Sequence, residues 1–565
     1  MGPLAESTQS VKDHTTAHPV HPLGKNARVL LTSVFGPYAQ DDEYGSRAIN
    51  PMELYHNQVT RVQHAFSLRM HHRSWGLMMI QANLDAPCTL LDFPTLDRFV
   101  QEVKTQRYDI VGISSIAVNV GKVAKMCSVI RQHLPEATIV VGGHLANLPN
   151  LDQKIDADHI VTGEGVRWMR RFLAQDPSQP VTHPHIVSGI GTRTMGVGVR
   201  AKRSEQTATL IPSVGCPLGC NFCSTSAMFG GKGNFIDFYK TGDELFEVMF
   251  DCEKTMDVKS FFVMDENFLL HRKRALRLLD LMAEHDKAWS LYVFSSAKAL
   301  RLYSMEQLVG LGISWVWMGL EGKNSQYAKV RGVDTRELVR AMQAHGICVL
   351  GSTIIGLEEH TPENIDAAIE YAVSHGTEFH QFMLYTAVPG TPLHKEHEDR
   401  GTLLDISECL DADIHGQFKF NFRHPHIRGG METEFLLKAF HRDFFVNGPS
   451  ILRIARTVLQ GWKRYKRHPN LRIRRRFAWE ARDLPVTLAG ALWAAKRSYR
   501  SNAALSARIT SVLKEIHREL GLKSRLTTPF VGRYLQVMIA REERRLKRGW
   551  TYEPPTFYET KPAIR

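Results

Sequence analysis

The cysteine-rich stretch of the chain reads GCPLGCNFC over residues 215–223. It places the thiols of Cys216, Cys220 and Cys223 on one short loop, directly after an apolar run that predicts a strand. A cubane iron-sulfur cluster takes one ligand on each iron, so three cysteines leave one iron open. A structural zinc site needs a fourth ligand, and the next cysteine, Cys252, lies too far along the chain for the usual spacing. The stretch therefore favours a 4Fe-4S cluster with one open iron.

The composition is typical of a soluble globular protein, with 43% hydrophobic and 23% charged residues. No uninterrupted apolar run reaches the ~18 to 20 residues that a membrane span needs. The N-terminus lacks the charged and then apolar pattern of a secretion signal, so we expect a cytoplasmic protein with a disordered leader over residues 1–26. Disulfides are rare in that compartment. The remaining cysteines are expected to be packing residues: Cys88, Cys127, Cys252, Cys348 and Cys409.

Short runs rich in Val and Ile alternate with amphipathic stretches over residues 27–173. The expected strands are Val29–Val34, Cys88–Phe93, Asp109–Ser114, Thr138–Gly142 and His159–Thr162. The runs lack a period of two, as strands buried on both faces do. This pattern predicts a doubly wound, flavodoxin-like parallel sheet, whose ligands bind at the carboxyl ends of the strands.

A second α/β series occupies residues 206–400, after a polar linker expected over residues 174–205. Its expected strands are Leu210–Ser213, Ser260–Met264, Leu291–Ser295, Trp315–Gly319, Val349–Ile355 and Gln381–Thr386. Six strand-helix repeats predict a partial (β/α)6 barrel, smaller than the eight-fold one.

Residues 401–565 are predicted to be basic and mainly helical. One apolar stripe at helical spacing consists of Leu505, Ile509, Val512, Leu513, Ile516 and Leu520. Residues 451–550 hold 25 Lys and Arg against 6 Asp and Glu, a balance of +19. We expect this segment to bind an anionic membrane peripherally, with aromatic anchors at Trp462, Tyr465, Trp479, Trp493 and Tyr499.

The CxxxCxxC spacing, with an aromatic residue before its last cysteine, resembles the signature of the radical S-adenosylmethionine (SAM) enzymes. The resemblance extends through about residue 400. It implies that the open iron binds SAM, and that an electron from the cluster cleaves SAM to a 5'-deoxyadenosyl radical. It also implies a reductant such as flavodoxin or ferredoxin.

The same resemblance implies a set of SAM-binding residues at the strand ends of the barrel. They are Phe222, Asp265, Glu266, Ser295, Ser296, Glu321 and Gly356. Asp265-Glu266-Asn267 stands where many members carry Gly-Gly-Glu, so the sequence departs from the family there. The alternative for each polar residue is that it caps the helix that follows.

A doubly wound domain ahead of such a barrel resembles the cobalamin-binding subgroup. The implied cobalamin contacts are Ser114, Ser115, Gly142, Gly143, His144, Gly163 and Glu164. The Asp-x-His-x-x-Gly segment that supplies a histidine to cobalt is absent, because the loop after the first strand reads FGPYAQDD over residues 35–42. Some relatives lack that histidine and still bind cobalamin, whereas others keep the fold without the cofactor.

The resemblance favours cobalamin-dependent radical methylation of an unactivated carbon. Two alternatives remain, a cobalamin-free radical coupling or rearrangement and a non-enzymatic cobalamin sensor. The substrate, the catalytic residues and the oligomeric state cannot be read from the sequence. The basic C-terminal helices favour a lipid substrate, by analogy with members of the family that alkylate lipids.

Overall fold

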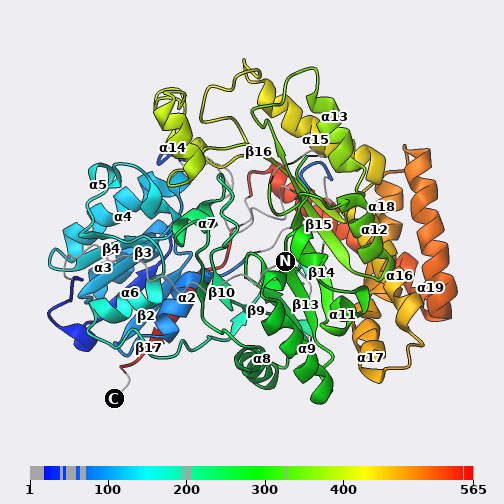
Figure 1. Ribbon diagram of the computed structural model, residues 1–565, viewed down its shortest axis with the longest axis horizontal. Helices are drawn as coiled ribbons and strands as arrows, with labels where there is room; N and C mark the ends of the chain where they lie inside the picture. The colour runs from blue at the N-terminus through cyan, green and yellow to red at the C-terminus, as the bar shows by residue number, and fades with distance from the viewer. Residues whose placement is uncertain are drawn as a thin grey trace.

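The computed structural model describes residues 18–38, 42–45, 59–63, 66, 71–190, 193–194, 197–198, 205–322, 325, 327–550 and 553–563. Figure 1 shows an α/β unit beside a second, larger sheet, with the C-terminal helices on the far side of that sheet. Of the expected leader, residues 1–17 lie outside the described residues. Residues 18–26 pack on the N-terminal unit, where His21 meets the ring of Phe172.

The N-terminal sheet has five parallel strands in the order β2-β1-β3-β4-β5. They are β1 (Val29–Thr32), β2 (Cys88–Asp92), β3 (Ile110–Ser114), β4 (Thr138–Gly142) and β5 (His159–Ile160). The helices are α2 (Trp75–Ala82), α3 (Leu96–Thr105), α4 (Val120–His133), α5 (Leu151–Lys154) and α6 (Gly165–Phe172). Leu30 packs in the cluster that contains α3 and α4, and Leu31 packs with α2 and α6, so both faces are buried. The prediction of a flavodoxin-like sheet is confirmed.

A sixth strand at the edge of this sheet comes from the other end of the chain. Strand β17 (Phe557–Lys561) pairs antiparallel with β2, from Asp92 to Cys88. The sequence analysis did not predict it. The chain therefore returns from the C-terminal helices to the N-terminal sheet, as the red strand beside β2 in Figure 1 shows.

The second sheet has six parallel strands that neighbour one another in chain order. They are β9 (Thr207–Leu210), β12 (Ser260–Val263), β13 (Ser290–Phe294), β14 (Ile313–Gly319), β15 (Cys348–Ile355) and β16 (Phe379–Leu384). The helices between them include α7 (Ser224–Met228), α8 (Gly242–Met256), α9 (Arg272–Glu284), α10 (Ala297–Leu300), α11 (Met305–Gly310), α12 (Thr335–Ala344) and α13 (Ile365–Val373). The partial (β/α)6 barrel is confirmed.

The expected linker contributes a strand to this barrel. Strand β6 (Ile186–Val187) pairs antiparallel with β9 and forms the edge of the sheet. A short pair, β7 (Arg193–Thr194) with β8 (Val197–Gly198), follows it. The domain boundaries proposed from the sequence stay predictions.

Five helices make up most of the C-terminal region. They are α15 (Met431–Asn447), α16 (Ser450–Tyr465), α17 (Leu471–Glu480), α18 (Ala489–Ser498) and α19 (Ala503–Lys547). The predicted stripe from Leu505 to Leu520 does face their core. Four of the five predicted aromatic anchors are used in packing, because Trp462, Trp493 and Tyr499 pack against that core and Tyr465 is 7% exposed. The fifth, Trp479, is half-buried with the Arg482 guanidinium 3.8 Å from its ring centroid, and membrane contact stays a prediction. No helix in the described part of the chain combines the length and apolarity that crossing a bilayer requires.

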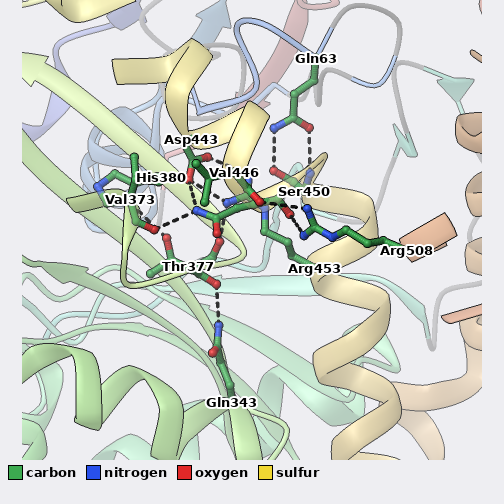
Figure 2. A network of polar contacts seen from close by, with 12 residues as sticks. Gln63, Gln343, Val373, Thr377, His380, Asp443, Val446, Ser450, Arg453 and Arg508 are labelled. Carbon is green, nitrogen blue, oxygen red and sulfur yellow. Dashed lines mark hydrogen bonds and ion pairs between the residues drawn. The ribbon is translucent and has the colours of Figure 1, made fainter. Parts of the chain in front are cut away.

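A buried arginine joins α16 to α15 by an ion pair and to the barrel by a hydrogen bond. Figure 2 shows Arg453 of α16 between the carboxylate of Asp443 and the carbonyl oxygen of Thr377, at distances of 2.8 and 2.7 Å. Gln63 holds Ser450 at the start of α16 through two hydrogen bonds. Removing one member of such a buried pair leaves an uncompensated charge, so this network fixes the position of α16 against the barrel.

Candidate active site

The three cysteines lie together on the wall of one cavity. The cavity has a volume of about 580 Å³ and lies at the carboxyl ends of the barrel strands. Cys216, Cys220 and Cys223 are partly exposed toward it, and none forms a disulfide. Burial raises the pKa of the Cys216 thiol to about 11, so binding of a metal must displace its proton. Ser226 supports the loop, because its hydroxyl donates to the Cys216 carbonyl oxygen at 2.8 Å.

The five other cysteines are buried and form no disulfide among the described residues, as expected of packing residues. Burial raises the pKa of Cys88, Cys127 and Cys252 to about 12. These thiols therefore stay protonated and unreactive in the interior.

A buried ion pair lies beside the cysteine loop. Lys329 Nζ lies 2.5 Å from Glu321 Oε1, while Glu321 Oε2 is buried and has no hydrogen-bond partner among the described residues. Burial lowers the pKa of Lys329, but Glu321 and then Cys220 raise it, and the net shift is upward. Lys329 also lies over the ring of Phe222, 4.9 Å from its centroid. The pair leaves one carboxylate oxygen free to accept a hydrogen bond from a ligand.

In the segment after β12, Asp265 supports the fold and Glu266 lines the cavity. Asp265 lies outside the lining, where it accepts from Ser213 at 2.6 Å and pairs with the buried Arg274. Glu266 lines the cavity, and no described residue forms a hydrogen bond with its buried Oε2. Burial, followed by the charge of Asp265, raises the pKa of Glu266 to about 8. Asn267 bridges to the next strand end, where its Oδ1 accepts from the Ser296 amide at 2.9 Å.

Of the remaining predicted SAM contacts, two line the cavity and one lies outside it. Ser295 and Ser296 line the cavity, although Ser296 also caps α10 by accepting from the Ala299 amide. Gly356 lies outside the lining, and a Cβ there would collide with the ring of Phe420. The structure thus brings five of the seven predicted SAM residues to the cavity: Phe222, Glu266, Ser295, Ser296 and Glu321.

A second cavity of about 400 Å³ lies over the strand ends of the N-terminal sheet. Six of the seven predicted cobalamin contacts line it: Ser114, Gly142, Gly143, His144, Gly163 and Glu164. Ser115 lies beside it, with a buried hydroxyl that has no hydrogen-bond partner. Glu164 has a structural task as well, because its carboxylate caps α6 by accepting from the amides of Val166 and Arg167.

The two cavities share part of their walls. His144, Thr225 and Glu266 line both. The Nδ1 atom of His144 is buried and has no hydrogen-bond partner in the part of the chain that the structure describes, and burial lowers the pKa of this ring, which favours neutral imidazole. A group bound over the N-terminal sheet is therefore separated by single side chains from a group bound at the cysteine loop.

The residues present fit an iron-sulfur cluster, SAM and a corrinoid. Three thiols converge on one loop, and two buried carboxylate oxygens on residues that line the same cavity lack partners among the described side chains and backbone. At Gly143 a Cβ would lie 2.6 Å from the Ser115 carbonyl oxygen, so the two turns below the second cavity touch directly. Such close turns let a flat or extended ligand approach the backbone. The assignment of individual ligands stays a prediction.

Sequence reasoning missed several residues of the larger cavity. Lys329 follows β14 on a loop without a recognisable motif, and Trp317 donates from Nε1 to Ser352 at 2.6 Å and stacks on Phe294. Trp317 was assigned only to an expected strand. The one available signal was its place two residues before the end of that strand, where side chains of a barrel approach the ligand.

Two family models match the chain, one over the N-terminal sheet and one over most of the barrel. Residues 67–173 match the model described as B12 binding domain, and residues 210–372 match the model described as radical SAM superfamily.

Individual relatives are distant. The chain is 23% identical to bacteriochlorophyllide d C-12(1)-methyltransferase of Chlorobaculum tepidum over 337 residues, which is 55% of this chain and 70% of that protein. It is 25% identical to the hopanoid C-2 methylase of Rhodopseudomonas palustris over 206 residues, 34% of this chain and 38% of that protein. A solved structure of the radical SAM methyltransferase TsrM from Kitasatospora setae, with cobalamin and a 4Fe-4S cluster bound, has a TM-score of 0.47 and 15% identity. It covers 74% of this chain and 89% of that one.

Proposed function

The chain belongs to the radical SAM superfamily, in the subgroup with an N-terminal cobalamin-binding domain, and we propose that it methylates an unactivated carbon. The observation that carries the proposal is the shared wall between the cavity of the thiols and the cavity of the glycine turns. When bound, a 4Fe-4S cluster with SAM supplies a 5'-deoxyadenosyl radical, and cobalamin supplies a methyl group that it takes from a second SAM molecule. Methyl transfer needs these two sites to be neighbours.

The chain's own residues bind, orient and exclude water. Cys216, Cys220 and Cys223 hold the cluster on a loop that the barrel fixes in place. The free oxygens of Glu266 and Glu321 accept hydrogen bonds from the ammonium and hydroxyl groups of SAM. Aromatic and aliphatic side chains from β13 to β16 complete the cavity and keep water from a reactive radical.

The organic substrate that accepts the methyl group is a lipid in this proposal. The larger cavity is walled by Phe294, Trp317, Ile354, Met383 and Leu384, which suit an apolar skeleton better than a charged one. The similarity to the hopanoid methylase supports the same substrate class. Flavodoxin or ferredoxin is the proposed electron donor.

Anaerobic reconstitution tests the chemistry. Loaded protein should bind about four irons and four sulfides, bind a corrinoid and cleave SAM to 5'-deoxyadenosine when reduced. Replacing Cys216, Cys220 or Cys223 with Ala should abolish cluster binding and SAM cleavage. Cys409→Ala is the matched control, because this buried thiol lies outside the cavity and should leave the cluster intact. SAM cleavage by any of the three single variants would refute the cluster assignment.

An experiment with SAM that carries an isotope label in its methyl group separates methylation from the alternatives. Transfer of the labelled methyl carbon to a lipid extract supports the proposal. If the protein cleaves SAM but cannot be loaded with a corrinoid, the cobalamin-free coupling or rearrangement replaces it. A corrinoid-binding protein without SAM cleavage would instead fit the sensor.

A further inference from the structure

Helix α19 is two helices joined at a sharp bend. Gly521 has φ 76° and ψ −161°, a conformation that non-glycine residues avoid. The bend brings His517 Nε2 within 3.1 Å of Thr528 Oγ1, although eleven residues separate them in the chain. The second helix, residues 522–547, therefore takes a direction of its own.

This second helix carries apolar side chains on two opposite faces. Its inner face packs Val531, Leu535 and Ile539 against α18, where Gly532 lies directly against the ring of Trp493. The outer face carries Leu522, Leu526, Phe530, Tyr534 and Val537, which are 59 to 75% exposed. Their spacing of three or four residues aligns them along one side of the helix, and we call this set the outer stripe.

Basic side chains border the outer stripe. Residues 521–547 contain seven Lys and Arg and only two Glu. Lys523, Arg533, Arg541 and Arg544 are exposed. Among the described residues, neither Arg533 nor Arg541 has an ion-pair partner. The surface thus combines a continuous apolar row with unneutralised positive charge.

We propose that the outer stripe docks on an anionic membrane surface, with the helix of residues 522–547 lying in the plane of the interface. Contiguous exposed apolar side chains mark an interaction site, whereas single ones do not. A second copy of this chain would bring two rows of positive charge together and is disfavoured. An anionic bilayer supplies hydrocarbon for the stripe and negative headgroups for its border.

The proposal replaces the aromatic anchors expected from the sequence with a different set of side chains. It stands independently of the proposed chemistry, because none of these residues lines either cavity. Failure of membrane binding would therefore leave methyl transfer untouched.

Vesicle co-sedimentation of the full chain tests it. The protein should bind vesicles of phosphatidylcholine with about one third phosphatidylglycerol at low salt, and should not bind pure phosphatidylcholine. Higher salt should weaken binding because it screens the headgroup charge. The double variant Leu526→Ser, Phe530→Ser should bind about tenfold more weakly or worse, since two anchoring side chains lose their transfer into hydrocarbon. Arg533→Glu with Arg541→Glu should cost about thirtyfold or more.

Matched variants control for exposure and for net charge. Leu302→Ser with Ile406→Ser removes two apolar side chains of similar exposure elsewhere, and Lys104→Glu with Arg107→Glu makes the same charge change at the end of α3. Both controls should bind as the wild type does, and circular dichroism should show all variants folded. The proposal would be overturned if the protein did not bind anionic vesicles, or if the stripe variants bound them normally. It would also be overturned if the protein formed a dimer that the stripe variant abolishes, or bound nucleic acid in place of vesicles.

Discussion

Two adjacent glycines at the end of β4 differ in what a side chain would meet. Gly143 has φ 78° and ψ −170°, and a Cβ there would contact Ser115 backbone at 2.6 Å. Gly142 would place a Cβ no closer than 3.7 Å to any atom, at the wall of the smaller cavity. Gly143 is therefore needed by the fold, whereas Gly142 limits only what can enter the cavity.

This difference predicts a graded loss of corrinoid binding. Gly142→Ala should have a small effect, and Gly142→Leu should weaken binding of hydroxocobalamin about tenfold to a hundredfold, because overfilling a packed site costs about 1 to 3 kcal/mol. Equilibrium dialysis followed by absorbance measures the affinity. Gly143→Ala is the contrasting variant, since it should lower the melting temperature. Wild-type affinity in Gly142→Leu would show that the corrinoid binds elsewhere.

At the residue scale, the sequence predicts functional side chains that belong to a motif of fixed spacing. It misses side chains that reach the site only because of how the chain folds. The thiols at 216, 220 and 223 share one loop, so their convergence follows from the motif itself. Lys329 and Trp317 reach the same cavity only because β14 ends there. Asp265 shows the reverse case, because the motif position is filled but its carboxylate pairs with Arg274 outside the cavity.

At the element scale, the buried parallel strands are predictable because each is a short apolar run between helices. Strand β17 is not, since Phe557–Lys561 reads FYETK and three of its five side chains are exposed. Its stability comes from backbone pairing with β2, at the opposite end of the chain. No local pattern encodes such a partner.

The segment that the sequence assigns to a linker is held by a histidine. His183 accepts from the Ile211 amide at Nε2, at 3.0 Å, and donates from Nδ1 to the Pro184 carbonyl oxygen, at 2.7 Å. Burial lowers the pKa of His183 from 6.5 to about 4. The unfolded segment therefore binds a proton in a pH range where the folded one does not.

This shift predicts acid weakening of the segment. Its stability is complete above the unfolded pKa and is lost as the pH falls through 6.5 toward 4. Between about pH 7 and about pH 5 the opening free energy at the Ile211 amide should fall by about 2 kcal/mol. Hydrogen exchange, corrected for the intrinsic effect of pH, measures it. His183→Gln, which cannot titrate, should show no such fall, and an equal fall in both proteins would contradict the assignment.

At the scale of the whole molecule, the net charge of a region does not predict which of its charged side chains lie on the surface. The C-terminal region counts many basic residues, but Arg453, Arg472 and Arg476 are at most 7% exposed and donate to barrel carbonyl oxygens. Four rings that the sequence suggested as anchors, Trp462, Tyr465, Trp493 and Tyr499, are likewise used in packing. Composition predicts a basic region correctly and cannot tell which side chains face water, because tertiary contacts decide that.

The return of the chain to the N-terminal sheet ties its two ends together. Lys561 Nζ donates to the carbonyl oxygens of Ala82 and Leu84, at 2.9 and 2.8 Å, at the end of α2. Gln81 Nε2 donates to the carbonyl oxygen of Glu559 at 3.2 Å. Helix α2 lines the smaller cavity, so strand β17 supports that cavity from behind.

Deleting residues 553–565 should therefore loosen the N-terminal sheet and weaken corrinoid binding, while the cluster loads normally. Each lost backbone hydrogen bond costs about 1 kcal/mol net, and the bare edge of β2 becomes open to pairing with other chains. Hydrogen exchange over residues 88–92 should accelerate, and hydroxocobalamin affinity should fall. Glu559→Thr is the matched control, because it changes an exposed side chain and keeps the ladder. Unchanged exchange in β2 after the deletion would show that β17 adds nothing to the sheet.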